Sequence, residues 1–99
     1  MDITLLYFDD CPNWRDVDER LAVLAAESPE ISVTRQLVET PAEAERIGFQ
    51  GSPSILVNGV DAFAATGSAA GLACRRYQTP DGQRGAPTLE QLRAVITNA

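Results

Sequence analysis

The side chains best suited to covalent chemistry in this 99-residue chain are those of its two cysteines, Cys11 and Cys74. The chain has no histidine, which excludes Ser-His-Asp and Cys-His catalysis and removes the commonest metal ligand. Two cysteines are too few for a disulfide scaffold. We therefore expect thiols that react, sense redox state or are buried, and we predict no resident metal.

Cys11 lies where a predicted strand passes into a predicted helix. Pro12 suits the first helical position, because its missing N–H would have no partner there. A sulfur at a helix N-terminus faces free backbone N–H groups and the positive end of the helix dipole, which favour thiolate. Asp9 and Asp10 precede it, and their negative charge opposes ionisation. The alternative is that Cys11 is a small apolar residue packed at the helix start.

The apolar pattern predicts alternating strands and helices around this cysteine. A continuous apolar run over 3–8 is typical of a central strand that is covered on both faces. Capping boxes at Thr40 and Thr88 predict the starts of two further helices, and Asn58-Gly59 predicts a two-residue hairpin turn. The predicted strands are 3–8, 31–38, 54–57 and 60–63, and the predicted helices begin at 12, 41 and 88. The long stretch between Phe63 and Thr88 predicts a hidden short helix over 68–76.

This order, β-α-β-α-β-β-α, predicts one α/β domain over residues 1–99. Its four strands form a mixed sheet with helices on both faces.

Two motifs in this frame resemble those of the thioredoxin and glutaredoxin superfamily across nearly the whole chain. They are Cys-Pro-Asn-Trp at 11–14, at a helix start, and Gly-Ser-Pro-Ser at 51–54, before a strand. The resemblance implies a thioredoxin-like fold with Cys11 as nucleophile and a cis Ser52–Pro53 peptide bond. It also implies that the backbone beside Ser52 pairs with substrate. Pro12, Trp14, Ser52 and Pro53 are the substrate-binding residues it indicates.

One position departs from the family pattern. Trp14 stands where the family has its second, resolving cysteine, so a dithiol cycle within the motif is excluded. Trp14 itself is best explained as a packing or lid residue. The chain after Phe63 starts over Cys11, so Cys74 could reach it if the two Cα atoms lie within about 7 Å. Small thioredoxin-like proteins with a later Ala-Cys-Arg segment, as at 73–75, are the nearest resemblance; the alternative for Cys74 is a packed structural thiol.

The charged residues limit the classes of partner that the protein can bind. A net charge of −6 disfavours nucleic acid and anionic membranes, and no apolar stretch is long enough to span a bilayer. The N-terminus has no basic region before an apolar run, so we expect a cytoplasmic protein. Arg75 and Arg76 either attract the carboxylates of a small thiol such as glutathione or form a solvated face.

Three functions remain open from the sequence. The first is a monothiol-type thiol–disulfide oxidoreductase that acts on a protein or small-molecule disulfide, in which Cys11 attacks and Cys74 or a small thiol resolves. The second is a non-catalytic module that binds partners in the Ser52-Pro53 groove. The third, ranked last, is capture of a soft metal or metalloid by Cys11 and Cys74. No cofactor is expected beyond the small thiol as co-substrate.

Overall fold

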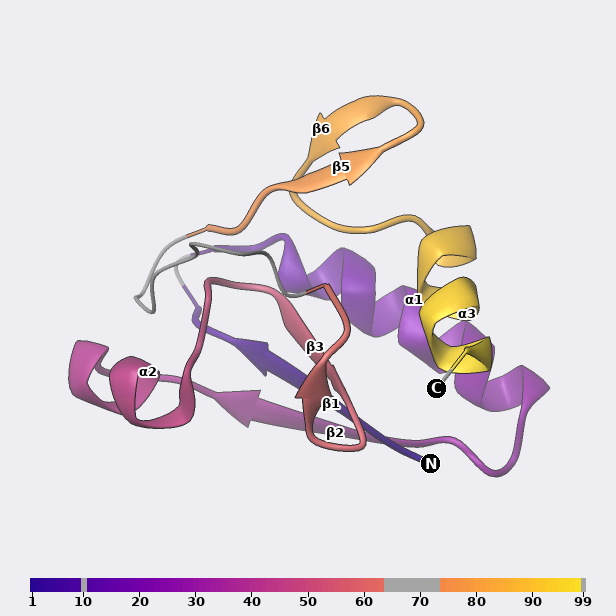
Figure 1. The fold of residues 1–99 in the computed structure, drawn as a ribbon, viewed down its shortest axis with the longest axis horizontal. Coiled ribbons are helices and arrows are strands. Elements are labelled where there is room, and N and C mark those ends of the chain that lie inside the picture. Colours follow the sequence, from indigo (N-terminus) through magenta and orange to yellow (C-terminus); the bar gives the residue numbers. More distant parts are fainter. Residues whose placement is uncertain (10, 64–73, 99) are drawn as a thin grey trace.

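A four-stranded mixed sheet forms the centre of the protein, and one of its two inner strands is the apolar run that leads to Cys11 (Figure 1). The computed structural model describes residues 1–9, 11–63 and 74–98. The strands are β1 (Asp2–Tyr7), β2 (Ser32–Leu37), β3 (Ser54–Val57), β4 (Val60–Asp61), β5 (Tyr77–Thr79) and β6 (Gly82–Arg84). The helices are α1 (Trp14–Glu27), α2 (Pro41–Ile47) and α3 (Leu89–Thr97).

The sheet has the order β2-β1-β3-β4. β1 pairs parallel with β2 and antiparallel with β3, and β3 pairs antiparallel with β4. Successive side chains of a strand point to opposite faces, so an apolar run is needed where both faces are covered. This arrangement explains why the buried positions of β1 are Ile3, Leu5 and Leu6.

Helices cover both faces of this sheet, as the sequence predicts. The larger core lies between the sheet and the helices α1 and α3; it contains Ile3, Leu5, Val17, Leu21, Leu24, Ile55, Val57, Tyr77, Ala86, Leu92 and Ile96. A smaller core includes the first residue after β2 and a residue of α2; it contains Leu6, Val38, Ala44 and Phe49. Leu5 and Leu6 are neighbours in β1 and belong to different cores, which identifies the two faces.

The predicted capping box is complete at Thr88 and half-formed at Thr40. At α3, Thr88 Oγ1 accepts a hydrogen bond from Gln91 N at 3.1 Å, and Thr88 N donates to Gln91 Oε1 at 2.9 Å. At α2, Thr40 Oγ1 accepts from Glu43 N at 3.1 Å. These side chains satisfy N–H groups that have no partner within the helix.

The predicted hairpin turn is also present. Asn58 and Gly59 have φ values of 51° and 88°, the left-handed conformation that a two-residue turn between β3 and β4 requires.

The predicted bounds of β1, β2 and α3 differ from the structure by one residue, and two other predicted bounds are wrong by two residues. α1 begins at Trp14 rather than at Pro12, because Pro12 and Asn13 form a turn in which Arg15 N donates to the Pro12 carbonyl at 3.1 Å. β4 ends at Asp61, whereas the predicted strand continues to 63.

The stretch between Phe63 and Thr88 also differs from the prediction. Residues 68–73 of the predicted helix lie outside the described residues, and 74–76 are not helical. β5 and β6 instead form a separate hairpin, and over residues 1–9, 11–63 and 74–98 the order is β-α-β-α-β-β-β-β-α (Figure 1). The turn sequence Pro-Asp-Gly at 80–82 signals this hairpin, but three-residue strands are too short to carry an apolar pattern.

Candidate functional site

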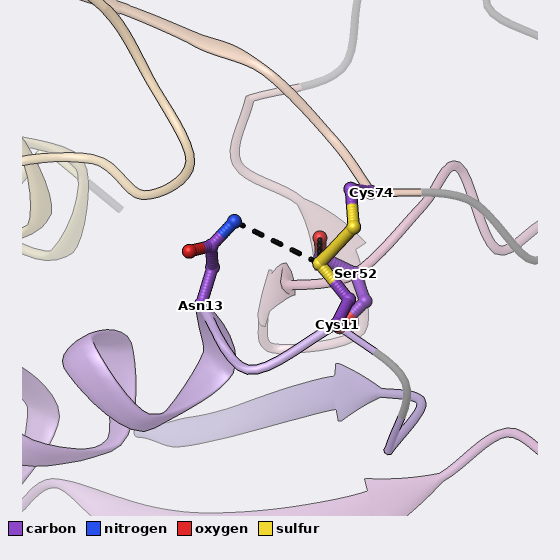
Figure 2. Close-up of a disulfide and its surroundings, with 4 residues drawn as sticks. All are labelled: Cys11, Asn13, Ser52 and Cys74. Atoms are coloured by element: carbon purple, nitrogen blue, oxygen red, sulfur yellow. Dashed lines mark hydrogen bonds between the residues drawn. A yellow bond between two sulfur atoms is a disulfide. The ribbon is translucent and has the colours of Figure 1, made fainter.

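Cys11 and Cys74 form a disulfide, although 63 positions separate them in the sequence (Figure 2). Their Cα atoms are 5.8 Å apart, within the limit that the sequence analysis set for this pairing. The two residues differ in access to solvent: Cys11 is fully buried, whereas Cys74 is exposed. An external thiol would therefore meet Cys74 first.

The turn between β1 and α1 places Cys11 beneath its partner. Cys11 N donates to the Phe8 carbonyl at 3.3 Å, which closes the chain into a turn directly after β1. The buried residues of α1, among them Val17, anchor the helix on the sheet and so hold this turn in place. Asp9 is exposed, and Asp10 lies outside the described residues.

Asn13 is the polar side chain that the sequence analysis missed. It occupies the N-cap position of α1 but makes no capping hydrogen bond. Its Nδ2 instead donates to Cys11 Sγ at 3.7 Å, and Figure 2 shows the amide turned toward the sulfur. A Cβ atom at Gly85 would overlap this amide, so the Asn13 side chain is held between Gly85 and the disulfide. The sequence feature that could have indicated this contact is an asparagine two residues after a cysteine near a helix start.

Ser52 lies on the other side of the disulfide. Its carbonyl oxygen is 3.6 Å from Cys11 Sγ and accepts a hydrogen bond from Arg75 N at 2.9 Å. Ser52 and Cys74 thus form a parallel bridge outside the main sheet. The Ser52–Pro53 peptide bond is cis, as the resemblance implies. The Ser52 backbone, which the resemblance assigns to substrate, is in this state paired with the chain's own Cys74 segment.

Arg75 departs from both sequence interpretations, because it is neither a solvated residue nor free to attract a ligand. Its side chain is 9% exposed and forms an ion pair with Asp61 Oδ2 at 2.8 Å. It also donates to Ser54 Oγ at 3.2 Å and to the Phe63 carbonyl. The guanidinium carbon lies 4.9 Å from the centre of the Tyr77 ring. These contacts tie the residue after Cys74 to β3 and β4; Arg76 is exposed.

Tyr77 also holds the segment that follows Cys74 in place. Its hydroxyl donates to the carbonyl of Pro53, and its ring packs edge-on against Phe63 with centroids 5.3 Å apart. Burial raises the pKa of Tyr77 well above its usual value, Arg75 acts in the opposite direction, and Asp61 raises the pKa further. The hydroxyl is therefore protonated, and able to donate, at neutral pH.

The remaining predicted substrate residues lie around the disulfide at different depths. Pro12 is exposed, and Pro53 is buried. Trp14 is half-buried, with its ring 4.4 Å from that of Tyr7, and it packs against the larger core. This packing agrees with the interpretation of Trp14 as a packing residue.

Within residues 1–9, 11–63 and 74–98, no group of three histidine, cysteine or acidic side chains is placed to hold a metal ion. Over the same ranges, no helix has the length and apolar character that crossing a membrane requires. Comparison of the chain with protein-family models, with curated proteins and with solved structures finds no match.

Proposed function

We propose that the protein is a thioredoxin-like thiol–disulfide oxidoreductase whose redox pair is Cys11 and Cys74. The observation that carries this proposal is the disulfide between a fully buried Cys11 in the turn before α1 and an exposed Cys74. The cis Ser52–Pro53 bond beside it, and a mixed sheet with helices on both faces, are features that the thioredoxin resemblance implies.

Oxidation of the protein proceeds in two exchange steps. The Cys11 thiolate attacks one sulfur of a protein or small-molecule disulfide, forms a mixed disulfide and releases the first substrate thiolate. The Cys74 thiolate then attacks Cys11 Sγ, releases the second thiolate and forms the Cys11–Cys74 bond. The substrate gains two electrons, and the two cysteines lose them.

Reduction starts at the other sulfur. A small thiol such as glutathione attacks the exposed Cys74 as thiolate, and the S–S bond breaks with Cys11 leaving as thiolate. A second thiol attacks the mixed disulfide on Cys74 and releases the small-molecule disulfide. Asn13 favours the leaving thiolate, because an N–H donor stabilises negative charge on sulfur.

The burial of Cys11 requires the Cys74 segment to move before Cys11 meets a substrate disulfide. Arg75 N donates to the Ser52 carbonyl, so the same movement frees the Ser52 backbone. We place this cycle in the cytoplasm, where persistent structural disulfides are rare and a transient one fits catalysis.

Trapping of the mixed disulfides tests this mechanism. Reduced protein is mixed with excess bis(2-hydroxyethyl) disulfide, quenched by alkylation and mapped by mass spectrometry. Wild type should form the Cys11–Cys74 bond, and Cys74→Ser should accumulate the adduct on Cys11. Oxidised wild type treated briefly with 2-mercaptoethanol should carry the adduct on Cys74. Equal oxidation rates of Cys11→Ser and wild type by the small disulfide would contradict the role of Cys11, and the double variant Cys11→Ser/Cys74→Ser gives the background.

A further inference from the structure

A polar cavity next to the disulfide has no role in the exchange steps above. It has a volume of about 310 Å³ and lies between the start of α1, the β5–β6 hairpin and the chain before α3. Asn13 forms part of its wall, and the same side chain donates to Cys11 Sγ. The size falls at the lower end of small-molecule sites in proteins.

Four charged side chains line this cavity, two from each side. Asp16 and Arg20 come from α1, four residues apart and hence on one helix face. Asp81 and Arg84 come from the β5–β6 hairpin and its turn. Each wall thus offers one carboxylate and one guanidinium.

These four side chains take no part in the short ion pairs of the described residues. Among residues 1–9, 11–63 and 74–98, ion pairs within 4.0 Å join Arg35 to Asp18, Arg75 to Asp61 and Arg93 to Glu27. No such pair involves a charged residue of the cavity in those ranges. Arg20 instead donates to the Pro87 carbonyl at 2.6 Å, which fixes the guanidinium at the cavity wall.

We infer that this cavity is a binding site for a small zwitterion, a molecule of amino-acid or dipeptide size that carries a carboxylate and an ammonium group. The carboxylate pairs with Arg20 and Arg84, and the ammonium group pairs with Asp16 and Asp81. A molecule with both charges satisfies both kinds of side chain at once, which a simple anion or cation cannot do. The site does not depend on the redox function, because binding requires no exchange step.

The affinity should be modest. Asp16, Asp81 and Arg84 are exposed, so water screens each contact. A ligand with few non-hydrogen atoms also has a low ceiling on binding free energy, so we expect dissociation constants in the millimolar range.

The test is an NMR titration of the oxidised, ¹⁵N-labelled full chain with glycylglycine and with single α-amino acids. Acetate and methylammonium serve as probes that carry one charge each. We expect saturable shifts at the amides of Asn13, Asp16, Thr79, Asp81 and Gly85, and weaker binding of both single-charge probes. Failure of every zwitterion to saturate these shifts, or equal affinity for acetate or methylammonium, would overturn the inference.

Matched variants locate the site. Arg84→Gln and Asp81→Asn should each raise the dissociation constant about two- to fivefold, the range of an exposed charge contact. Arg76→Gln is the control, because Arg76 is exposed, carries the same charge and does not line the cavity. Equal affinity in Arg84→Gln and Arg76→Gln would contradict the assignment. Because binding is measured without any thiol, loss of redox activity in a cysteine variant would leave this result unaffected.

Discussion

Asn13 Nδ2 donates to Cys11 Sγ at 3.7 Å, and the same amide fills the space above the Cα atom of Gly85. The N-cap position usually directs a side chain to the backbone of its own helix. Here the Asn13 side chain donates to the sulfur instead, so α1 starts without that capping bond. The buried sulfur thereby gains a donor at the point where charge develops when the disulfide breaks.

Replacement of this donor should slow disulfide reduction. Asn13→Asp places a carboxylate beside Cys11 Sγ, and we expect its reduction by dithiothreitol to be about tenfold slower, because a like charge disfavours the leaving thiolate. The rate is measured by timed alkylation of the released thiols. Gly85→Ala should slow reduction in the same direction, since its Cβ displaces the Asn13 amide. An unchanged rate in both variants would contradict this role for Asn13.

The ion pair of Arg75 should contribute far more to stability than a surface pair of the same length. Arg75 and Asp61 have side chains only 9% and 15% exposed, whereas Arg93 and Glu27 are 47% and 48% exposed, and both N–O distances are 2.8 Å. Arg75→Met removes the ion-pair partner of the largely buried Asp61 carboxylate, which keeps, among the described residues, only the bond from Phe63 N, and should lower the unfolding free energy by about 3 kcal/mol. Arg93→Met should lower it by less than about 1 kcal/mol. Urea unfolding of both variants checks the contrast, and similar losses would be inconsistent with it.

Alkaline pH should destabilise the protein through Tyr77. Its pKa is raised in the folded state, mainly by burial, so the folded protein holds the phenolic proton more tightly than the unfolded chain. The resulting stability is fully present below a pH of about 10, the pKa of tyrosine in the unfolded chain, and it is lost as the pH rises above that value. The chain contains no lysine, so few other groups titrate in this range.

Tyr77→Phe is the control for that pH dependence. At neutral pH the variant loses the bond to the Pro53 carbonyl and should be less stable by about 1 kcal/mol. Above pH 10 the difference in unfolding free energy between wild type and Tyr77→Phe should become smaller, because only wild type has this buried phenol to ionise. Parallel loss of stability in both proteins from pH 9 to 12 would show that other groups dominate.

The disulfide should stabilise the fold as well as carry chemistry. It closes a loop of 63 positions, and the chain-entropy model gives about 4 kcal/mol for that length. Cys11→Ala/Cys74→Ala should therefore unfold at lower urea than the oxidised protein, and reduced wild type should lie close to the double variant. Equal midpoints of oxidised and reduced wild type would contradict this expectation.

Much of the frame around Cys11 follows from short-range patterns in the sequence. The apolar run of β1, the capping box at Thr88 and the Asn58-Gly59 turn depend on residues within a few positions of one another. Propensity, capping and turn chemistry act over that range, so the mixed sheet with helices on both faces could be predicted. The resemblance added the cis Ser52–Pro53 bond.

The β5–β6 hairpin escaped prediction for a local reason. Its strands have three residues each, and β6 reads Gly-Gln-Arg, which has no apolar period to detect. The hairpin nevertheless brings Gly85 against Asn13 and forms one wall of the polar cavity.

The sequence by itself determined that a thiol lies between a strand and a helix of one α/β domain, and the resemblance added its place beside Pro53. Only the tertiary structure decided that Cys74 covers Cys11, that Arg75 is buried against Asp61, and that Asn13 turns to the sulfur. Most of these contacts join segments far apart in the chain, and the choice of Asn13 between a cap and the sulfur depends on Gly85 from across the fold. Local pattern carries no information about such pairings, because packing of distant segments selects among side-chain arrangements that are equally acceptable to the local backbone.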